Sequence, residues 1–277
     1  MKVQVNWLKE YTEIDVPTDE LGHVLTMAGL EIESHETVDL PDGEKSEVLE
    51  LNVTPNRGYC LSHIGVAREV SALLKKSLKL SDPMKTISTE SGTVDIEDRL
   101  SVENLEPELC SRYCALVIEN IKVGPSPKWL KDRLFAIGLR PINNIVDITN
   151  FVMMEYGQPL HAFDRDLLTG NKIVIRRAKK GELFSSLDGT ELKLEQDALV
   201  IADGDKPVAL AGIMGGTNSQ VSETPSHVVL ESACFDPATI RKGSKKYGLR
   251  SDSSYRFERG VDLKGVVSAQ ARAALLI

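Results

Sequence analysis

The chain has 277 residues, of which 42% are hydrophobic and 27% are charged, and its formal net charge is −8. A chain of this length and composition is expected to fold into two or more globular domains, and its acidic balance argues against a protein that coats nucleic acid over its whole surface. Its hydrophobic runs are too short to span a bilayer and its first residues lack the apolar region of a signal peptide, so we expect a cytoplasmic protein without membrane contact.

The first 80 residues predict a small domain that mixes strands and helices. Its expected elements, in chain order, are a strand and turn within 1–11, a helix capped by Thr18 and closed by Gly29, strands at 31–38 and 48–53, and a helix over 63–76 capped by Ser62. A charged, turn-rich connection at 40–47 separates the two later strands. The polar stretch 81–92 interrupts the pattern, and we expect a linker there.

A larger mixed region begins at residue 93. Its pattern predicts strands at 93–96, 112–118, 172–177, 192–194, 198–202, 208–213 and 228–231, a tight turn at 187–190, a helix after Pro125 with Ser126 as its cap, and a helix from Asp236 to Tyr247. A last helix, capped by Asp262, is still apolar at residue 277. We therefore expect a fragment of a longer protein, with 263–277 as the start of a truncated following segment.

Polar residues are unusually dense among apolar ones between residues 141 and 164. The pattern predicts a helix over 144–157, followed by a Gln-Pro turn that presents His161. Thr149 and Asn150 lie partly off the apolar stripe of that helix, which suggests a helix end and a loop that converge on a polar pocket. The alternative is a polar network that only braces a turn.

Two further features could carry chemistry. The segment ALAGIMGG, at 209–216, is neither a Walker loop nor a GxGxxG fingerprint, but its glycines would let a ligand approach the backbone and its N–H groups. A simple tight turn is the alternative. Glu231 ends an apolar strand, where it is either a surface residue or a buried acceptor that needs a partner.

Metal binding and nucleophilic catalysis find little support in the sequence. The cysteines are scattered, at Cys60, Cys110, Cys114 and Cys234, without a CxxC pair, and the histidines have no HxxxH or HxH spacing. We expect reduced thiols and no metal site. No Ser/His/Asp or Cys/His arrangement is evident, so any hydrolysis would use bound water.

A basic segment stands out in this acidic chain. Between residues 241 and 259 there are seven basic residues and two acidic ones. The segment is either a phosphate-binding face or the solvated surface of a helix. The candidate RNA-binding residues are Arg241, Lys242, Lys245, Lys246 and Arg250.

Four collinear segments carry a resemblance to a known family. In chain order they are LELNVTPNRGYCLSHIGVAREVSAL, RPINNIVDITNFVMMEYGQPLHAFD, ALAGIMGG and VVLESACFDPATIRKGSKKYGLRSDSSYRFERGVD. Together they resemble the beta subunit of bacterial phenylalanyl-tRNA synthetases over nearly the whole chain. The resemblance implies an α+β fold, with a small winged-helix-like B1 domain at 1–80, a linker at 81–92 and a mixed α/β B3/B4 editing module at 93–262.

The resemblance also implies an activity, which is the hydrolysis of tyrosine wrongly attached to the phenylalanine tRNA. The residues that match the family's editing pocket are Thr149, Asn150, His161, Ala211, Gly212, Gly215 and Glu231. Glu231 would accept the tyrosine hydroxyl as an ionised carboxylate, and a pocket built for that bond rejects phenylalanine because its polar group would be left unpaired. Thr149, Asn150 and His161 would orient the terminal ribose and a hydrolytic water, and the N–H groups of the glycine turn would hold the ester or carboxylate oxygens.

The family further implies partners and cofactors that lie outside this chain. Phenylalanine attachment would take place in the alpha subunit of an α2β2 holoenzyme, with ATP and Mg²⁺, and this chain alone would neither aminoacylate nor hold a cofactor. One departure is that many bacterial members insert an OB-fold tRNA-binding domain where this chain has only the connection 40–47. The rival interpretations are a non-catalytic scaffold that binds tRNA or a subunit, and a free-standing factor that edits in trans.

Overall fold

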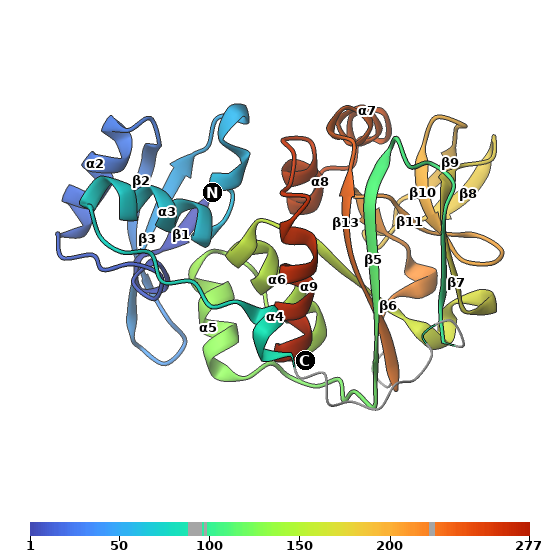
Figure 1. Cartoon of the computed structure of the whole chain (residues 1–277), viewed down its shortest axis with the longest axis horizontal. Coiled ribbons are helices and arrows are strands. Elements are labelled where there is room, and N and C mark those ends of the chain that lie inside the picture. Colours follow the sequence, from blue (N-terminus) through green and yellow to red (C-terminus); the bar gives the residue numbers. More distant parts are fainter. Residues whose placement is uncertain (88–95, 97–98, 222–224) are drawn as a thin grey trace. The chain divides into compact units, whose positions relative to one another are not determined.

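The computed structural model describes residues 1–87, 96, 99–221 and 225–277. The chain forms two compact units that alternate along the sequence (Figure 1). The first unit combines Met1–Asp82 with Pro125–Gly157, and the second combines Pro83–Gly124 with Gln158–Ile277. The predicted domains are consecutive stretches and the predicted linker at 81–92 is only partly among the described residues, so these domain boundaries stay a prediction.

The first unit contains a three-stranded antiparallel sheet in the order β1-β3-β2. Its elements are β1 (Lys2–Gln4), α1 (Val5–Leu8), α2 (Thr18–Met27), β2 (Glu31–Asp39), β3 (Lys45–Asn52), the 3-10 helix η1 (Pro55–Cys60) and α3 (His63–Leu74). Asp39 pairs with Lys45, so the predicted charged connection is a short hairpin and contains no domain. The two predicted strands and the helix capped by Ser62 are confirmed, with Ser62 accepting a bond from the Gly65 N–H.

Two further helices complete this unit, α5 (Lys128–Ala136) and α6 (Asn144–Tyr156). The α6 helix is confirmed: the Asn143 side chain accepts a hydrogen bond from the Val146 N–H, and the helix ends before Gly157. Two predicted caps are wrong, because Pro17 and Pro127 occupy the N-cap positions of α2 and α5.

The displaced polar side chains make other contacts. The Ser126 hydroxyl donates to the Asp147 carboxylate at 2.5 Å, and the Thr18 hydroxyl donates to Glu47. A side chain that hydrogen-bonds a residue distant in the sequence cannot also cap its own helix. The local sequence pattern therefore predicts both caps wrongly.

The first unit contains a buried aromatic stack. The Trp7 ring lies between His63 and Phe151, with ring centroids 3.7 Å and 4.7 Å away. Trp7 Nε1 donates to the Tyr11 hydroxyl at 3.1 Å, and that hydroxyl donates to Glu155 Oε1 at 2.5 Å. Trp7, Tyr11 and Glu155 are all buried, so the polar atoms of the stack are paired inside the core.

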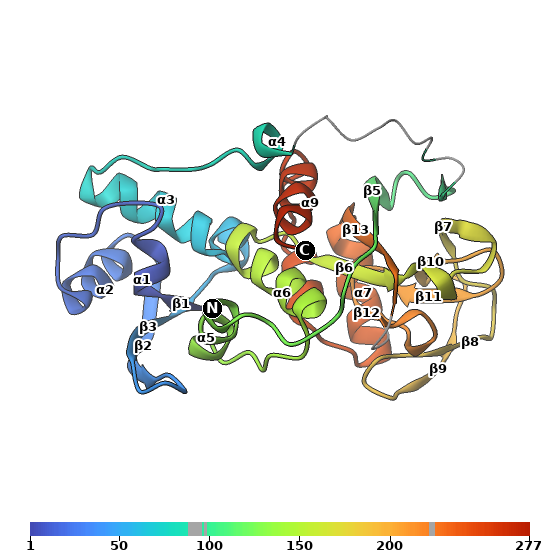
Figure 2. The ribbon, with the colours of Figure 1, turned by 90° about the horizontal axis from the view of Figure 1, so that it is seen from below.

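The second unit is built on an antiparallel sheet in the order β5-β13-β6 and a five-stranded sheet in the order β12-β11-β10-β7-β4 (Figure 2). The strands are β4 (Ser101–Asn104), β5 (Cys110–Glu119), β6 (Leu160–Asp164), β7 (Lys172–Arg177), β8 (Glu182–Ser185), β9 (Glu191–Leu194), β10 (Leu199–Ala202), β11 (Pro207–Leu210), β12 (Met214–Gly215) and β13 (His227–Phe235). β8 and β9 form a hairpin at the predicted tight turn, and β4 runs parallel to β7.

The two faces of β13 contact different layers. Val229, Ala233 and Phe235 join a buried apolar cluster that includes strands of the five-stranded sheet. On the alternate positions, the Ser232 hydroxyl donates to the Val266 carbonyl at 2.8 Å, which ties β13 to α9 (Gly265–Leu276). The period of two along a strand therefore places one face of β13 in the inter-sheet core and the other against a helix.

The remaining elements of this unit are helical. They are α4 (Pro83–Thr86), η3 (Arg165–Leu167), η4 (Thr169–Asn171), η5 (Thr217–Ser219), α7 (Pro237–Tyr247) and α8 (Asp252–Phe257). The α7 helix is confirmed with its predicted cap, because the Asp236 carboxylate accepts a bond from the Thr239 N–H at 2.7 Å. The α8 helix was not predicted, and it begins with a capping box between Ser251 and Ser254.

His161, which the predicted Gln-Pro turn presents, lies in β6 and is paired with β13. Two other predictions are corrected. The predicted strand at 208–213 ends at Leu210, and Gly215 belongs to β12. Lys264, rather than Asp262, occupies the N-cap position of α9. The Asp262 carboxylate accepts a hydrogen bond from the Lys264 N–H, which lies before the first residue of the helix. Residues 93–95 of the predicted strand 93–96 lie outside the described residues.

The structure confirms the α+β class, since both units contain helices and sheets, and the five-stranded sheet of the second unit is mixed. Within the described ranges, no helix is long and apolar enough to cross a membrane.

Candidate functional site

Glu231 and His161 are direct partners across two antiparallel strands. Glu231 lies on β13 and His161 on β6, in register, so their side chains leave the sheet on the same face. Tyr113, on the other neighbouring strand, β5, donates its hydroxyl to Glu231 Oε2 at 2.7 Å. Three strands thus bring a carboxyl, an imidazole and a phenol to one place on the face that turns toward the inter-sheet core.

The Glu231 carboxyl has an unusual ionisation. The side chain is only 7% exposed, and this burial raises its pKa from 4.5 to about 7, while the Tyr113 hydrogen bond works in the opposite direction. The carboxyl therefore keeps its proton to a higher pH than an ordinary glutamate, which differs from the ionised acceptor that the resemblance implied. Within the described residues, Tyr113 is its one hydrogen-bond partner, which leaves Oε1 for another donor.

The His161 imidazole is neutral at physiological pH. Burial lowers its pKa from 6.5 to about 4, although the residue as a whole keeps some solvent exposure. Its Nε2 atom is buried and has no hydrogen-bond partner among the described residues, and its ring contacts Phe163 edge-on, with centroids 4.6 Å apart. An unpaired buried ring nitrogen is costly, so this atom is ready to bond a ligand or a water.

Gly215 lies directly against the imidazole. A Cβ atom at this position would come 2.5 Å from His161 Cε1 and 2.8 Å from Nε2, so any larger residue would displace the ring. Gly212 has a different role: its φ is +67°, and a Cβ there would meet Ile240 and Phe235 at 2.9 Å. Gly215 therefore borders the site, whereas Gly212 shapes the turn against apolar side chains.

The glycine turn has fewer spare donors than its sequence suggested. The N–H groups of Ala211, Ile213 and Gly216 donate to the carbonyls of Leu199, Leu210 and Val208. Ala211 is also buried in the apolar cluster. Only the N–H groups of this turn that do not already donate to a carbonyl could bind the oxygens of a ligand.

Thr149 and Asn150 lie on α6, in the first compact unit. Thr149 is buried, and its hydroxyl donates to the Val146 carbonyl at 2.8 Å within the helix. His161, Glu231, Ala211, Gly212 and Gly215 all belong to the second unit. The structure brings these five together in one unit, and the assembly of Thr149 and Asn150 with them stays a prediction.

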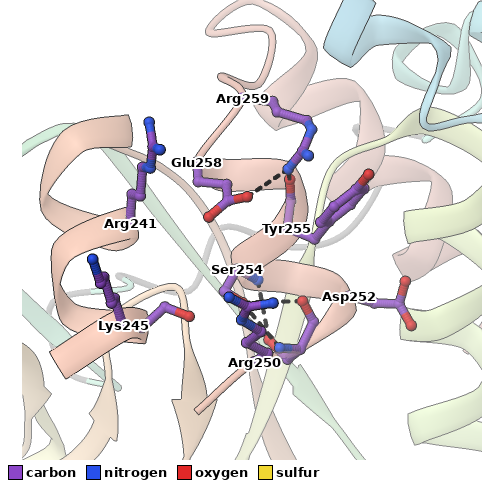
Figure 3. A pocket seen from close by; sticks show the side chains of 10 residues that line it. Arg241, Lys245, Arg250, Asp252, Ser254, Tyr255, Glu258 and Arg259 are labelled. Carbon is purple, nitrogen blue, oxygen red and sulfur yellow. Dashed lines mark hydrogen bonds and ion pairs between the residues drawn. The ribbon is translucent and has the colours of Figure 1, made fainter. Parts of the chain in front are cut away.

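The basic segment lines a cavity of about 720 Å³ in the second unit (Figure 3). The lining residues are Arg241, Ser244, Lys245, Arg250, Ser251, Asp252, Ser254, Tyr255, Glu258 and Arg259. Arg241, Lys245 and Arg250 thus share one cavity. Lys242 and Lys246 are not among its lining residues, and Lys246 pairs with Asp197 at 2.5 Å instead.

Sequence reasoning missed Tyr113 and Tyr255, and it counted Arg259 in the basic segment but not among the candidate RNA-binding residues. Tyr113 lies in a predicted strand, but only the register of β5 against β13 places its hydroxyl beside Glu231. Tyr255 and Arg259 lie four residues apart on and after the unpredicted α8, where helical spacing was the available signal. In the described part of the chain, no group of three or more His, Cys, Asp or Glu side chains could hold a metal ion.

The chain is similar in sequence to proteins of known family. The family model of the B3/4 domain matches residues 109–277. The phenylalanine–tRNA ligase beta subunit of Carboxydothermus hydrogenoformans is 51% identical over 86% of this chain, and that of Rhodopirellula baltica is 44% identical over the whole chain. The chain spans 30% and 39% of the lengths of these two relatives.

A solved structure was also found, an N-terminal fragment of the phenylalanyl-tRNA synthetase beta-subunit from Pyrococcus horikoshii. It is 13% identical to this chain, with a TM-score of 0.43, and the match covers 90% of this chain and 74% of that one.

Proposed function

Because this chain belongs to the B3/4 domain family, we propose that it is the editing part of a phenylalanine–tRNA ligase beta subunit and that it hydrolyses tyrosine wrongly esterified to the phenylalanine tRNA. The site on β5, β13 and β6 is the proposed location of tyrosine recognition. The similarity to phenylalanine–tRNA ligase beta subunits supports the choice of amino acid and tRNA.

The observation that carries the proposal is the bond between the Tyr113 hydroxyl and Glu231. It demonstrates that this buried carboxyl accepts a phenol O–H within its own fold. The second carboxyl oxygen, Oε1, would accept the hydroxyl of a tyrosine ester in the same manner. A phenylalanine ester has no such donor, so its binding would bury Oε1 without a partner, and a site of this kind discriminates strongly against the analogue that lacks the hydroxyl.

His161 would position the hydrolytic water rather than remove its proton. An imidazole with a pKa of about 4 is a weak base at pH 7, whereas an efficient general base has a pKa near the working pH. Its buried Nε2, which has no hydrogen-bond partner in the part of the chain that the structure describes, can still hold a water or a ribose hydroxyl by a hydrogen bond. Gly215 would keep the space beside the imidazole open.

The partners follow from the same proposal. The chain would work in the cytoplasm within a holoenzyme, proposed as α2β2, in which the alpha subunit attaches phenylalanine to the tRNA with ATP and Mg²⁺. This chain would add the hydrolytic step and hold no cofactor of its own.

The test uses the complete enzyme and two substrates, tyrosyl-tRNA(Phe) and phenylalanyl-tRNA(Phe), with ester loss as the measurement. Glu231→Ala is expected to slow hydrolysis of the tyrosyl ester by about 100-fold or more and to remove most of the discrimination between the esters. Glu119→Ala, a partly exposed carboxylate on the neighbouring strand β5, is the matched control and should leave both rates unchanged. Unchanged discrimination in the Glu231 variant would sink the recognition model and favour the non-catalytic scaffold.

A further inference from the structure

The basic cavity of the second unit is formed mainly by α7 and α8. Arg241 and Lys245 are one helical turn apart on α7, while Tyr255 and Arg259 lie across from them, with Glu258 between (Figure 3). Its volume of about 720 Å³ could hold a nucleotide-sized group. The elements of the proposed hydrolytic site, β5, β6 and β13, contribute no lining residue.

The charges in this cavity are not balanced. Its two carboxylates are already engaged, since Asp252 pairs with Arg256 at 2.9 Å and Glu258 pairs with Arg259 at 2.5 Å. Within the described ranges, Arg241, Lys245 and Arg250 form no ion pair, and all three are exposed. Three unpaired cations that line one hollow favour an anion with several negative groups.

An aromatic group completes the cavity. The Arg259 guanidinium lies 3.5 Å from the centroid of the Tyr255 ring, and that ring is 41% exposed. Arg259 Nε is buried and lacks a hydrogen-bond partner among the described residues. A flat aromatic surface beside unpaired cations is the combination that binds single-stranded nucleic acid, in which bases stack and phosphates pair with basic side chains.

We propose that this cavity binds a single-stranded segment of RNA, with Arg241, Lys245 and Arg250 on its phosphates and the Tyr255–Arg259 pair against a base. The inference rests on the proposed function only in that the RNA would be the tRNA substrate. It separates the basic residues of α7 into two groups, since Lys242 and Lys246 do not line the cavity and Lys246 is already paired.

The experiment measures binding of fluorescently labelled tRNA(Phe) to the complete enzyme by anisotropy, at several salt concentrations. The double variant Arg241→Glu/Lys245→Glu is expected to bind about tenfold more weakly near 0.15 M salt, with a smaller slope of affinity against salt. Tyr255→Ala should weaken binding by a few-fold at all salt concentrations. The matched control is Lys242→Glu/Lys246→Glu, which makes the same change of charge on the same helix and should weaken binding less than twofold.

Equal weakening by the two double variants would overturn the proposal, because it would reflect general attraction by the helix rather than a site. Unchanged binding in the cavity variant would overturn it as well. So would loss of association with the alpha subunit, measured by size-exclusion chromatography, because it would assign the cavity to a protein partner. The assay does not depend on ester hydrolysis, so a failure of the Glu231 test with cavity-dependent tRNA binding would refute the hydrolytic proposal and leave the RNA site standing.

Discussion

Each compact unit contains a buried hydrogen bond from a tyrosine to a glutamate. In the first unit Tyr11 donates to Glu155 at 2.5 Å, and in the second Tyr113 donates to Glu231 at 2.7 Å. Both carboxyl side chains are less than a tenth exposed. Burial also raises the pKa of both phenols, so both remain protonated donors.

The surroundings of the two pairs differ. The Tyr11 hydroxyl also accepts the Trp7 indole N–H, and that indole stacks on two further rings, so the first pair is one part of a paired network. Among the residues that the structure describes, Glu231 has the single partner Tyr113, and the imidazole beside it has a nitrogen without a partner. The same two side chains therefore brace a core in one unit and leave hydrogen-bonding capacity for a ligand in the other.

Removal of each carboxyl should separate the two roles most clearly. We expect Glu155→Ala to lower the free energy of unfolding by about 3 kcal/mol, because it leaves the buried Tyr11 O–H without an acceptor inside a packed network. Glu231→Ala should lower the free energy of unfolding by less than about 1 kcal/mol at pH 8. The substitution also removes a buried charge, and the gain from that removal offsets the lost hydrogen bond. Tryptophan fluorescence during urea unfolding reports on the first unit, where Trp7 and Trp129 lie, and circular dichroism serves for the second. Equal losses would contradict the contrast.

The pH dependence of stability tests the ionisation of the second site. Between pH 4.5 and 7, folded Glu231 keeps a proton that the unfolded chain has released, so this carboxyl lowers the free energy of unfolding by about 3 kcal/mol as pH rises through that window. Between pH 4 and 6.5, the unfolded chain holds a proton that folded His161 lacks, so the imidazole raises the same quantity by a similar amount.

These two opposing contributions can be unmasked by single substitutions. With Glu231→Gln the histidine contribution remains, and stability relative to the parent chain should gain with rising pH up to about 7. With His161→Gln the glutamate contribution remains, and stability relative to the parent should decline as pH rises from 4 to 6.5. Urea unfolding across this pH range gives the free energy of unfolding of each variant relative to the parent chain. If this difference changed with pH in the same direction for both variants, the assigned ionisation would be wrong.

The two glycines of the turn offer a smaller test. Gly212→Ala should cost about 2 kcal/mol of stability, because an alanine is strained at a φ of +67° and meets the Ile240 and Phe235 side chains. Gly215→Ala should cost less stability but reduce hydrolysis of tyrosyl-tRNA at least about tenfold, because it displaces the His161 ring. The measurements are urea unfolding for stability and ester loss for hydrolysis. If Gly212→Ala slowed hydrolysis more than Gly215→Ala did, Gly215 would not border the site.

A small effect is expected from Tyr113→Phe. Loss of one hydrogen bond to the carboxyl should lower stability by about 1 kcal/mol. Since that bond lowers the pKa of Glu231, its removal should raise this pKa above 7, which ¹³C NMR titration of the labelled carboxyl can follow. A pKa that does not move would show that the Tyr113 hydroxyl leaves Glu231 in solution.

Several elements could be predicted from the sequence because their signals are local. The α7 helix has its capping Asp236 immediately before Pro237, and α6 has Asn143 before an apolar stripe, so neighbouring residues contain the instruction for each helix. The strand at 172–177 was predicted for the same reason. The resemblance to phenylalanyl-tRNA synthetase beta subunits, drawn from four collinear segments, is confirmed by the 51% identical relative and the B3/4 domain match.

Other features depend on residues that are distant in the sequence. The local pattern predicts Ser126 as a helix cap, but its hydroxyl donates to Asp147, 21 residues away. The sequence predicts a turn that presents His161, but it does not predict that the His161 backbone pairs with β13, because the residues around it show no partner strand.

The sequence by itself determined the residue types of the candidate site and their order along the chain. Only the tertiary structure decided how those residues behave. Glu231 and His161 become neighbours through strand pairing, and Tyr113 reaches the carboxyl from 118 residues away. Burial by these distant segments moves the Glu231 pKa to about 7 and leaves the imidazole neutral, and neither effect has a local signature because desolvation depends on what packs around a side chain.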